Sequence, residues 1–280
     1  MNADDLPTLR AELEAHGLWA NKSLGQHFLL DLNITRRIAN VAGEIAGKVV
    51  IEIGPGPGGL TRALLEAGAD PLIVIEKDAR FLPLLEPLVA WSRGRLRIVP
   101  GDALEVDEEK LLNGARAAII SNLPYNVGTP LLVKWLKAGP WRGDMILMFQ
   151  KEVAQRIVAK PGADAYGRLA VLAQARCDAR LEFVVGPRAF TPPPKIASAI
   201  VRLTDLADPY PHLAALERVT AAAFGQRRKM LRSALRALTP DAEALLREAE
   251  LEPTARAEEI DQAGFRRLAE AWRTLSASAS

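Results

Sequence analysis

Thiols, histidines and net charge are all scarce in this sequence. Its 280 residues contain one cysteine, Cys177, and three histidines, and the formal net charge is +2. One thiol cannot form an internal disulfide or a site with several thiolate ligands, and the histidines are not arranged as metal ligands, so we expect no metal. The simplest interpretation of a single thiol is a reducing compartment, so we expect a cytoplasmic protein. With so small a net charge, evidence for nucleic-acid binding must come from local clusters of cations.

Long apolar runs are also absent. None approaches the roughly 20 residues that a membrane-spanning helix needs, and residues 1–5 lack the basic-then-apolar pattern of a secretion signal. We therefore expect no membrane association. With 49% apolar residues, the chain can nevertheless bury a full core. Its length favours one large and one small domain.

Short β-rich runs alternate with helical stretches between residues 49 and 150, which is the pattern of parallel βα units. Leu60, Leu64 and Leu65 recur at helical spacing after the first run, and Gly68 supplies a stop. An α/β domain with a parallel sheet is therefore predicted. The expected strands are residues 49–53, 71–75, 96–99, 117–121 and 145–149.

The composition of the sequence changes near residue 205. Before this point, two β-like runs at 182–185 and 198–203 flank a proline-rich segment, and we expect them to pair antiparallel at the sheet edge. Asp208-Pro209-Tyr210-Pro211 is typical of a linker. Beyond it, apolar residues recur every three or four positions, which predicts a small helical domain. We therefore place one domain at 1–205 and a second at 206–280.

A glycine-rich segment, Glu52-Ile53-Gly54-Pro55-Gly56-Pro57-Gly58, follows the first expected strand. Glycines admit positive φ and close approach of a nucleotide-like ligand, so Gly54 and Gly56 are candidate cofactor-binding residues. Glu76 ends the next strand, where a carboxylate can accept hydrogen bonds from both ribose hydroxyls of an adenosine-containing cofactor. Asp102 follows the third strand and could hold the adenine amine. Taken singly, the glycines could be turn residues and the acids helix caps; their order along the chain indicates a nucleotide-type cofactor.

NAD or FAD would suit those residues too, so the choice depends on Asn122-Leu123-Pro124-Tyr125 after the fourth strand. An exocyclic aromatic amine is a poor nucleophile because its lone pair is delocalised into the ring. Its methylation therefore needs acceptors that draw the amine hydrogens out of plane, and the Asn122 side chain and the Leu123 carbonyl are such acceptors. Pro124 stiffens the turn, and Tyr125 offers a ring for stacking of the target base. The pattern favours S-adenosylmethionine. The alternative is a simple proline turn with a half-buried tyrosine.

Phe190 is a second candidate for clamping a base. It precedes three prolines, Pro192 to Pro194, and a stiff polyproline-like segment would fix its ring with little loss of entropy. A core phenylalanine at a strand end is the alternative.

A cluster of five cations and no acid lies at residues 226–236. Phosphate contacts are its natural use, although charge runs on helices are often only solvated faces. Lys22, Arg36 and Arg37 could extend the same surface. The residues that we expect to bind RNA are Arg227, Arg228, Lys229 and Arg232.

Ordered motifs along nearly the whole chain resemble the KsgA family, the small-subunit ribosomal RNA adenine dimethyltransferases. The motifs are residues 24–29 (LGQHFL), 52–56 (EIGPG), 122–126 (NLPYN), 150–153 (QKEV), 166–169 (YGRL), 190–195 (FTPPPK) and 224–229 (FGQRRK). The resemblance implies a Rossmann-like class I methyltransferase domain at 1–205 and a helical RNA-binding domain at 206–280. It also implies that the S-adenosylmethionine site is lined by His27, Leu29, Gly54, Glu76, Asp102 and Asn122.

By the same resemblance, the enzyme would dimethylate two adjacent adenosines in the 3′-terminal hairpin loop of 16S rRNA in the immature small ribosomal subunit. Loop bases unstack cheaply, which suits flipping onto Tyr125 and Phe190. One alternative is the Erm group, which methylates 23S rRNA. Another is an assembly factor with a vestigial site. A third is an NAD-dependent dehydrogenase, which would leave residues 122–125 and the cation cluster unexplained. Nothing in the sequence requires more than a monomer.

Overall fold

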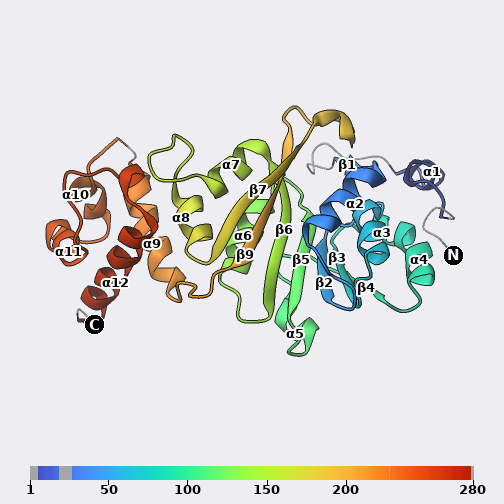
Figure 1. Cartoon of the computed structure of the whole chain (residues 1–280), viewed down its shortest axis with the longest axis horizontal. Coiled ribbons are helices and arrows are strands. Elements are labelled where there is room, and N and C mark those ends of the chain that lie inside the picture. Colours follow the sequence, from blue (N-terminus) through green and yellow to red (C-terminus); the bar gives the residue numbers. More distant parts are fainter. Residues whose placement is uncertain (1–5, 19–26, 227, 279–280) are drawn as a thin grey trace. The chain divides into compact units, whose positions relative to one another are not determined.

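The computed structural model describes residues 6–18, 27–226 and 228–278, which form two compact units (Figure 1). The first unit comprises Met1–Ala154 and Arg180–Thr204, and the second comprises Gln155–Ala179 and Asp205–Ser280. The predicted boundaries are therefore wrong for residues 155–179. This segment joins the helical unit because its helix α8 (Arg168–Gln174) packs on α9 (Leu213–Gly225) and α12 (Gln262–Ser278). No helix in the described ranges is long and apolar enough to cross a membrane.

A seven-stranded sheet with the order β4-β3-β2-β5-β6-β9-β7 forms the centre of the first unit. Neighbouring strands from β4 to β6 run parallel, and β9 pairs antiparallel with β6. Parallel strands are buried on both faces, which explains why β3 is a continuous apolar run that ends in Glu76. The bounds are β2 (Val49–Ile53), β3 (Leu72–Glu76), β4 (Leu96–Pro100), β5 (Ala117–Asn122), β6 (Arg142–Gln150), β7 (Cys177–Val185) and β9 (Ser198–Asp205).

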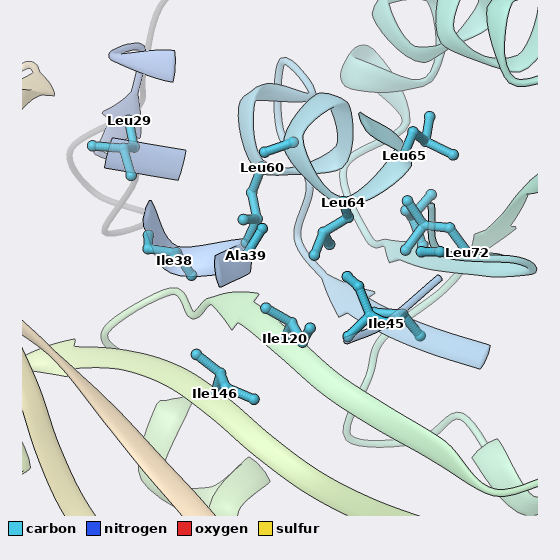
Figure 2. Close-up of a cluster of buried hydrophobic side chains, with 14 of the residues drawn as sticks. Leu29, Ile38, Ala39, Ile45, Leu60, Leu64, Leu65, Leu72, Ile120 and Ile146 are labelled. Atoms are coloured by element: carbon cyan, nitrogen blue, oxygen red, sulfur yellow. The ribbon is translucent and has the colours of Figure 1, made fainter. Parts of the chain in front are cut away.

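Helices follow the strands of this sheet. The helix α3 has seven of its eight residues buried, because its leucines pack on α2 and on the sheet. Figure 2 shows this core, with Ile38 of α2 and Leu64 of α3 above Ile120 and Ile146 of the sheet. The bounds in the first unit are α1 (Leu9–Ala15), α2 (Leu32–Val41), α3 (Gly59–Glu66), η3 (Ala79–Phe81), α4 (Leu82–Ser92), α5 (Glu108–Leu112), α6 (Gly128–Leu136) and η4 (Pro187–Ala189). The helix α7 (Lys151–Val158) begins in this unit and ends in the second.

Two short strands form a separate antiparallel pair, β1 (Phe28–Leu29) and β8 (Phe190–Thr191). Phe28 lies opposite Thr191, and Leu29 lies opposite Phe190. The pair fastens the segment before α2 to the proline-rich segment before β9.

The second unit is helical, as the apolar spacing predicted. Aromatic rings fill its core: Phe224 stacks on Phe265 at a centroid distance of 5.5 Å, and the hydroxyl of Tyr166 donates to the Ile260 carbonyl at 2.9 Å. After α8 and α9, the remaining elements are α10 (Leu231–Ala234), η5 (Leu235–Ala237), α11 (Ala242–Glu248), η6 (Ala257–Glu259) and α12.

Candidate active site

The predicted cofactor residues meet at one edge of the sheet. Gly54 follows β2, Glu76 ends β3, Asp102 follows β4 and Asn122 ends β5, and these strands are parallel neighbours. Open α/β sheets bind ligands at this carboxyl edge. Two clefts lie here, and they share Gly54, Glu76 and Pro124. One of them also contains Asp102. The other also contains His27, Leu29, Gly56, Asn122, Leu123 and Tyr125.

The glycine segment makes the tight turn that the motif predicted. Gly54 has a φ of +63°, and a Cβ atom at this position would lie 3.5 Å from Cγ of Pro124. Gly58 has a φ of +85°, and a Cβ atom there would approach the Leu88 side chain to 2.5 Å. A side chain at either position is disfavoured by the backbone conformation, and at Gly58 also by space. The turn thus keeps the cleft beside Gly54 open to a ligand.

The carboxylate of Glu76 is oriented by backbone groups. Oε1 accepts a hydrogen bond from the Asp78 N–H at 2.7 Å, and Oε2 accepts one from the Gly56 N–H at 3.3 Å. Burial raises the pKa of Glu76, while these backbone hydrogen bonds act in the opposite direction. Each carboxylate oxygen has a second lone pair, so the group can still accept hydrogen bonds from two hydroxyls. That geometry fits the predicted ribose contact.

Asp102 is fixed in the loop after β4. Its Oδ1 accepts from the Leu104 N–H at 2.9 Å, and its Oδ2 accepts from Lys77 Nζ at 2.6 Å. The hydrogen bond from Lys77 is the main cause that lowers the pKa of Asp102. The carboxylate is therefore ionised at neutral pH and can accept a hydrogen bond from an amine.

An ion pair between a half-buried lysine and a buried glutamate supports this loop. Lys134 of α6 donates to the Ala103 carbonyl at 2.6 Å and lies 2.7 Å from Glu108 Oε2. The other oxygen of Glu108 accepts from Trp135 Nε1 at 2.9 Å, and Glu108 is only 2% exposed. The network ties the position of Asp102 to α6.

The segment after β5 leaves two acceptors for a ligand. Among the described residues, neither the Asn122 side chain nor the Leu123 carbonyl has a hydrogen-bond partner outside the strand ladder. The Pro124 carbonyl instead accepts from the N–H groups of Val127 and Gly128 at 3.2 and 3.1 Å, which starts α6. The turn therefore has its own hydrogen bonds, and the two acceptors predicted to bind the target amine are both available in one cleft.

Tyr125 is held at its hydroxyl and beside its ring. The hydroxyl lies 2.6 Å from Ser198 Oγ, and the ring centroid lies 5.5 Å from that of His27 at an interplanar angle of 32°. His27 Nδ1 is 2.8 Å from the Pro192 carbonyl. Because a carbonyl can only accept, Nδ1 carries the hydrogen, and Nε2 is an acceptor in the neutral ring. Burial raises the pKa of Tyr125, so the phenol is neutral at physiological pH.

Phe190 does not line either cleft. Its side chain is 3% exposed and packs in the hydrophobic core that includes Leu29 and Ile200. The pairing of β8 with β1 places it there, opposite Leu29. The structure favours the core alternative for Phe190, and its role as a base clamp stays a prediction.

Glu52 is a cleft residue to which the sequence assigned no role. It is 2% exposed, and its Oε2 accepts from the Thr61 hydroxyl at 2.7 Å. Desolvation by burial raises the pKa of Glu52 to about 8. The signal was present in the sequence, because apolar neighbours on both sides predict a strand that is buried on both faces. An acid in such a strand is buried and prone to protonation.

The cation cluster lies in the second unit, where Arg228, Lys229 and Arg232 are exposed. Within the described part of the chain, their side chains make no ion pair. Arg36 and Arg37 belong to the first unit and have partners: Arg36 pairs with Glu66 at 2.8 Å, and the Arg37 guanidinium lies 3.9 Å from the centroid of the Phe183 ring. Several residues named from the sequence lie outside the described residues, namely Lys22, Leu24, Gly25, Gln26 and Arg227.

Comparison with known proteins identifies the family. A model of the family described as ribosomal RNA adenine dimethylase matches residues 17–273. The chain belongs to this family. It is 62% identical to the ribosomal RNA small subunit methyltransferase A of Phenylobacterium zucineum, over 97% of this chain and 95% of that protein. It is 56% identical to the protein of the same name from Azorhizobium caulinodans, over 96% of this chain and 94% of that protein.

Solved structures agree on the fold of these rRNA adenine dimethylases. A dimethyladenosine transferase from Plasmodium falciparum superposes with a TM-score of 0.75 at 23% identity, over 89% of this chain and 98% of that chain. The 23S rRNA methyltransferase ErmE superposes with a TM-score of 0.66 at 26% identity, over 88% of this chain and 99% of that chain. The predicted class I methyltransferase fold with a C-terminal helical part is confirmed. A dehydrogenase is excluded.

Proposed function

We propose that this rRNA adenine dimethylase transfers methyl groups from S-adenosylmethionine to two adjacent adenosines in the 3′-terminal hairpin loop of 16S rRNA. The two available acceptors beside Tyr125, the Asn122 side chain and the Leu123 carbonyl, are the observation that carries the proposal. The substrate is the immature small ribosomal subunit in the cytoplasm, and the enzyme acts as a monomer.

The cofactor assignment is supported by the cleft itself. The glycine turn leaves space beside Gly54, Glu76 has free lone pairs for ribose hydroxyls, and Asp102 is an ionised acceptor for an adenine amine. His27, Leu29, Gly56 and Asn122 would complete the site. S-adenosylmethionine, when bound, supplies a methyl group on a sulfonium, which is an electrophile for an amine nitrogen.

The residues after β5 then activate the amine by orientation. Asn122 Oδ1 and the Leu123 carbonyl accept the two amine hydrogens and draw them out of the plane of the base, which localises the lone pair on the nitrogen. Tyr125 stacks on the base and holds it at the cleft. Orientation of this kind can supply about 7 to 11 kcal/mol of a reaction barrier. No strong general base is needed, because the amine becomes acidic once it is methylated.

The helical unit carries cations that can bind RNA. Arg228, Lys229 and Arg232 are exposed and unpaired among the described residues, so they can neutralise phosphates of the RNA. Arg227 is part of the same proposal, which rests there on the sequence alone.

A small-subunit substrate is favoured over the large-subunit alternative. The chain shares 62% identity with a small subunit methyltransferase A over nearly its whole length, against 26% with ErmE. No observation specifically favours the alternative of an assembly factor with a vestigial site, because the Asn122 side chain and the Leu123 carbonyl are both available in the cleft. A checkpoint role beside catalysis is compatible with the same site.

Substitution of Asn122 tests the function. We expect Asn122→Ala to abolish methyl transfer to unmethylated small subunits, because the Leu123 carbonyl alone cannot orient both amine hydrogens. We expect it to weaken S-adenosylmethionine binding by no more than a few fold, because Asn122 is one of several residues that line the cofactor cleft. Asn40→Ala is the matched control, since Asn40 is exposed on α2. Normal turnover by Asn122→Ala would contradict the role of the amide. No turnover by the unsubstituted enzyme would contradict the function.

A further inference from the structure

The hydroxyl of Tyr125 forms a hydrogen bond with a segment that is distant in the sequence from the turn in which Tyr125 lies. Tyr125 lies in the turn after β5, whereas Ser198 is the first residue of β9 and is completely buried. Their oxygens are 2.6 Å apart although the residues are 73 positions apart in the sequence. The pairing of Ser198 with Gln150 at the end of β6 fixes the position of the serine. The ring is thus held at its hydroxyl end by the strand β9 and at its backbone end by the turn after β5.

The ring of Tyr125 also lies beside that of His27. That ring is itself held through Nδ1 by the Pro192 carbonyl, a contact between residues 165 positions apart. A tyrosine ring without such contacts can tilt freely about its last side-chain torsion, because that torsion has a broad energy well. The hydrogen bond at the hydroxyl fixes the direction of the long axis of the ring, and the neighbouring His27 ring limits rotation about that axis, so the two contacts together define one plane for the tyrosine. A stacked base would take its orientation from this plane.

We propose that Ser198 is a positioning residue for the target base and that it acts by fixing the long axis of the Tyr125 ring, whose rotation His27 limits. This inference rests on the proposed function. Ser198 lines neither cleft, so it acts only through the tyrosine. A fixed position of the ring matters most for the second methyl transfer to each adenine. In the first transfer two acceptors can hold two amine hydrogens, but the monomethylated amine has only one hydrogen left to hold.

Each transfer has the same electron balance. The nitrogen lone pair forms the N–C bond while the C–S bond of the sulfonium breaks, and sulfur keeps that electron pair. The amine then loses one proton to solvent. In the second transfer the stack on Tyr125 must supply the orientation that the missing second hydrogen bond no longer gives. Removal of the Ser198 hydroxyl is therefore expected to slow the second transfer more than the first.

The test compares Ser198→Ala, Tyr125→Phe and the double variant on unmethylated small ribosomal subunits with labelled S-adenosylmethionine. Removal of a hydrogen bond of ordinary strength corresponds to about a tenfold fall in kcat. We expect each single variant to show that fall and to accumulate monomethyladenine, with an unchanged dissociation constant for the cofactor. The double variant is expected to be no slower than either single one, since both remove the same hydrogen bond. Ser198→Thr, which keeps a hydroxyl, is expected to restore the dimethyl product.

Thr220→Val is the matched control, because Thr220 is also fully buried and its hydroxyl donates at 2.6 Å to the Leu216 carbonyl in the helical unit. This variant shows how the loss of a buried hydroxyl changes the melting temperature when Tyr125 is not affected. Equal product ratios in Ser198→Ala and the unsubstituted enzyme would overturn the inference, as would full activity of Tyr125→Phe. An unsubstituted enzyme that methylates no small subunit would instead overturn the proposed function.

Discussion

Replacement of Glu52 by glutamine changes how stability depends on pH in the ligand-free protein. Glu52 is buried in the cleft wall, and desolvation raises the pKa from 4.5 to about 8. Between these two values the native state keeps a proton that the unfolded state has released. Stability attributable to Glu52 is therefore fully present below pH 4.5 and is lost as the pH rises toward 8. A one-proton difference corresponds to a decrease of about 1.4 kcal/mol for each pH unit within that window.

Glutamine has the shape of the protonated acid and does not titrate, so Glu52→Gln lacks this decrease. We expect the two proteins to be nearly equally stable at pH 5 and the variant to be more stable by a few kcal/mol at pH 8. Urea unfolding of both proteins at several pH values measures the difference in unfolding free energy. Glu14→Gln, on the exposed face of α1, is the control. The reasoning about desolvation would be refuted if the difference in unfolding free energy between Glu52→Gln and the unsubstituted protein did not increase with pH.

Two further predictions concern the loop that carries Asp102 and the cation cluster. Lys134→Met leaves the buried Glu108 carboxylate without its half-buried cation, so we expect a decrease of about 1 to 3 kcal/mol in unfolding free energy and weaker cofactor binding, measured by urea unfolding and calorimetry. The control is a variant of the helical unit with the same loss of unfolding free energy. Its methylation activity separates the effect of lower stability from the effect of weaker cofactor binding. Replacement of Arg228, Lys229 and Arg232 by glutamine is expected to reduce the salt dependence of small-subunit binding by a slope of about 0.7 to 0.9 for each phosphate that the variant no longer neutralises. Cofactor affinity should not change, and an unchanged salt slope would exclude these residues from the RNA interface.

The sheet could be predicted well from the sequence because its central strands are buried on both faces. The observed bounds of β2, β3, β4 and β5 differ from the predicted ones by a single residue at most at either end. The strand β6 begins three residues earlier than predicted, at Arg142, because its first residues are polar. Gly143 follows Arg142, and a Cβ atom at Gly143 would lie 2.9 Å from the Ala117 carbonyl oxygen. The neighbouring strand β5 comes too close for a side chain here, so the start of β6 lacks the apolar residues by which a buried strand is predicted.

The site could be predicted only as far as the topology dictates it. Parallel strands bring Gly54, Glu76, Asp102 and Asn122 to one edge whatever their side chains do. The partners of Tyr125 and His27 could not be predicted, because those contacts join distant segments and leave no periodic signal. Phe190 shows the same limit. Stiffness of the proline-rich segment is a local property, whereas burial of the ring follows from pairing with β1.

The most direct test of the account is methyl transfer from labelled S-adenosylmethionine to unmethylated small and large ribosomal subunits, offered separately, with mass mapping of the modified nucleotides. The account predicts dimethyladenine at two adjacent positions in the 3′-terminal hairpin of 16S rRNA and no label in the large subunit. Label confined to the large subunit would contradict the proposed substrate, and tight binding of small subunits without any transfer would contradict the proposed activity.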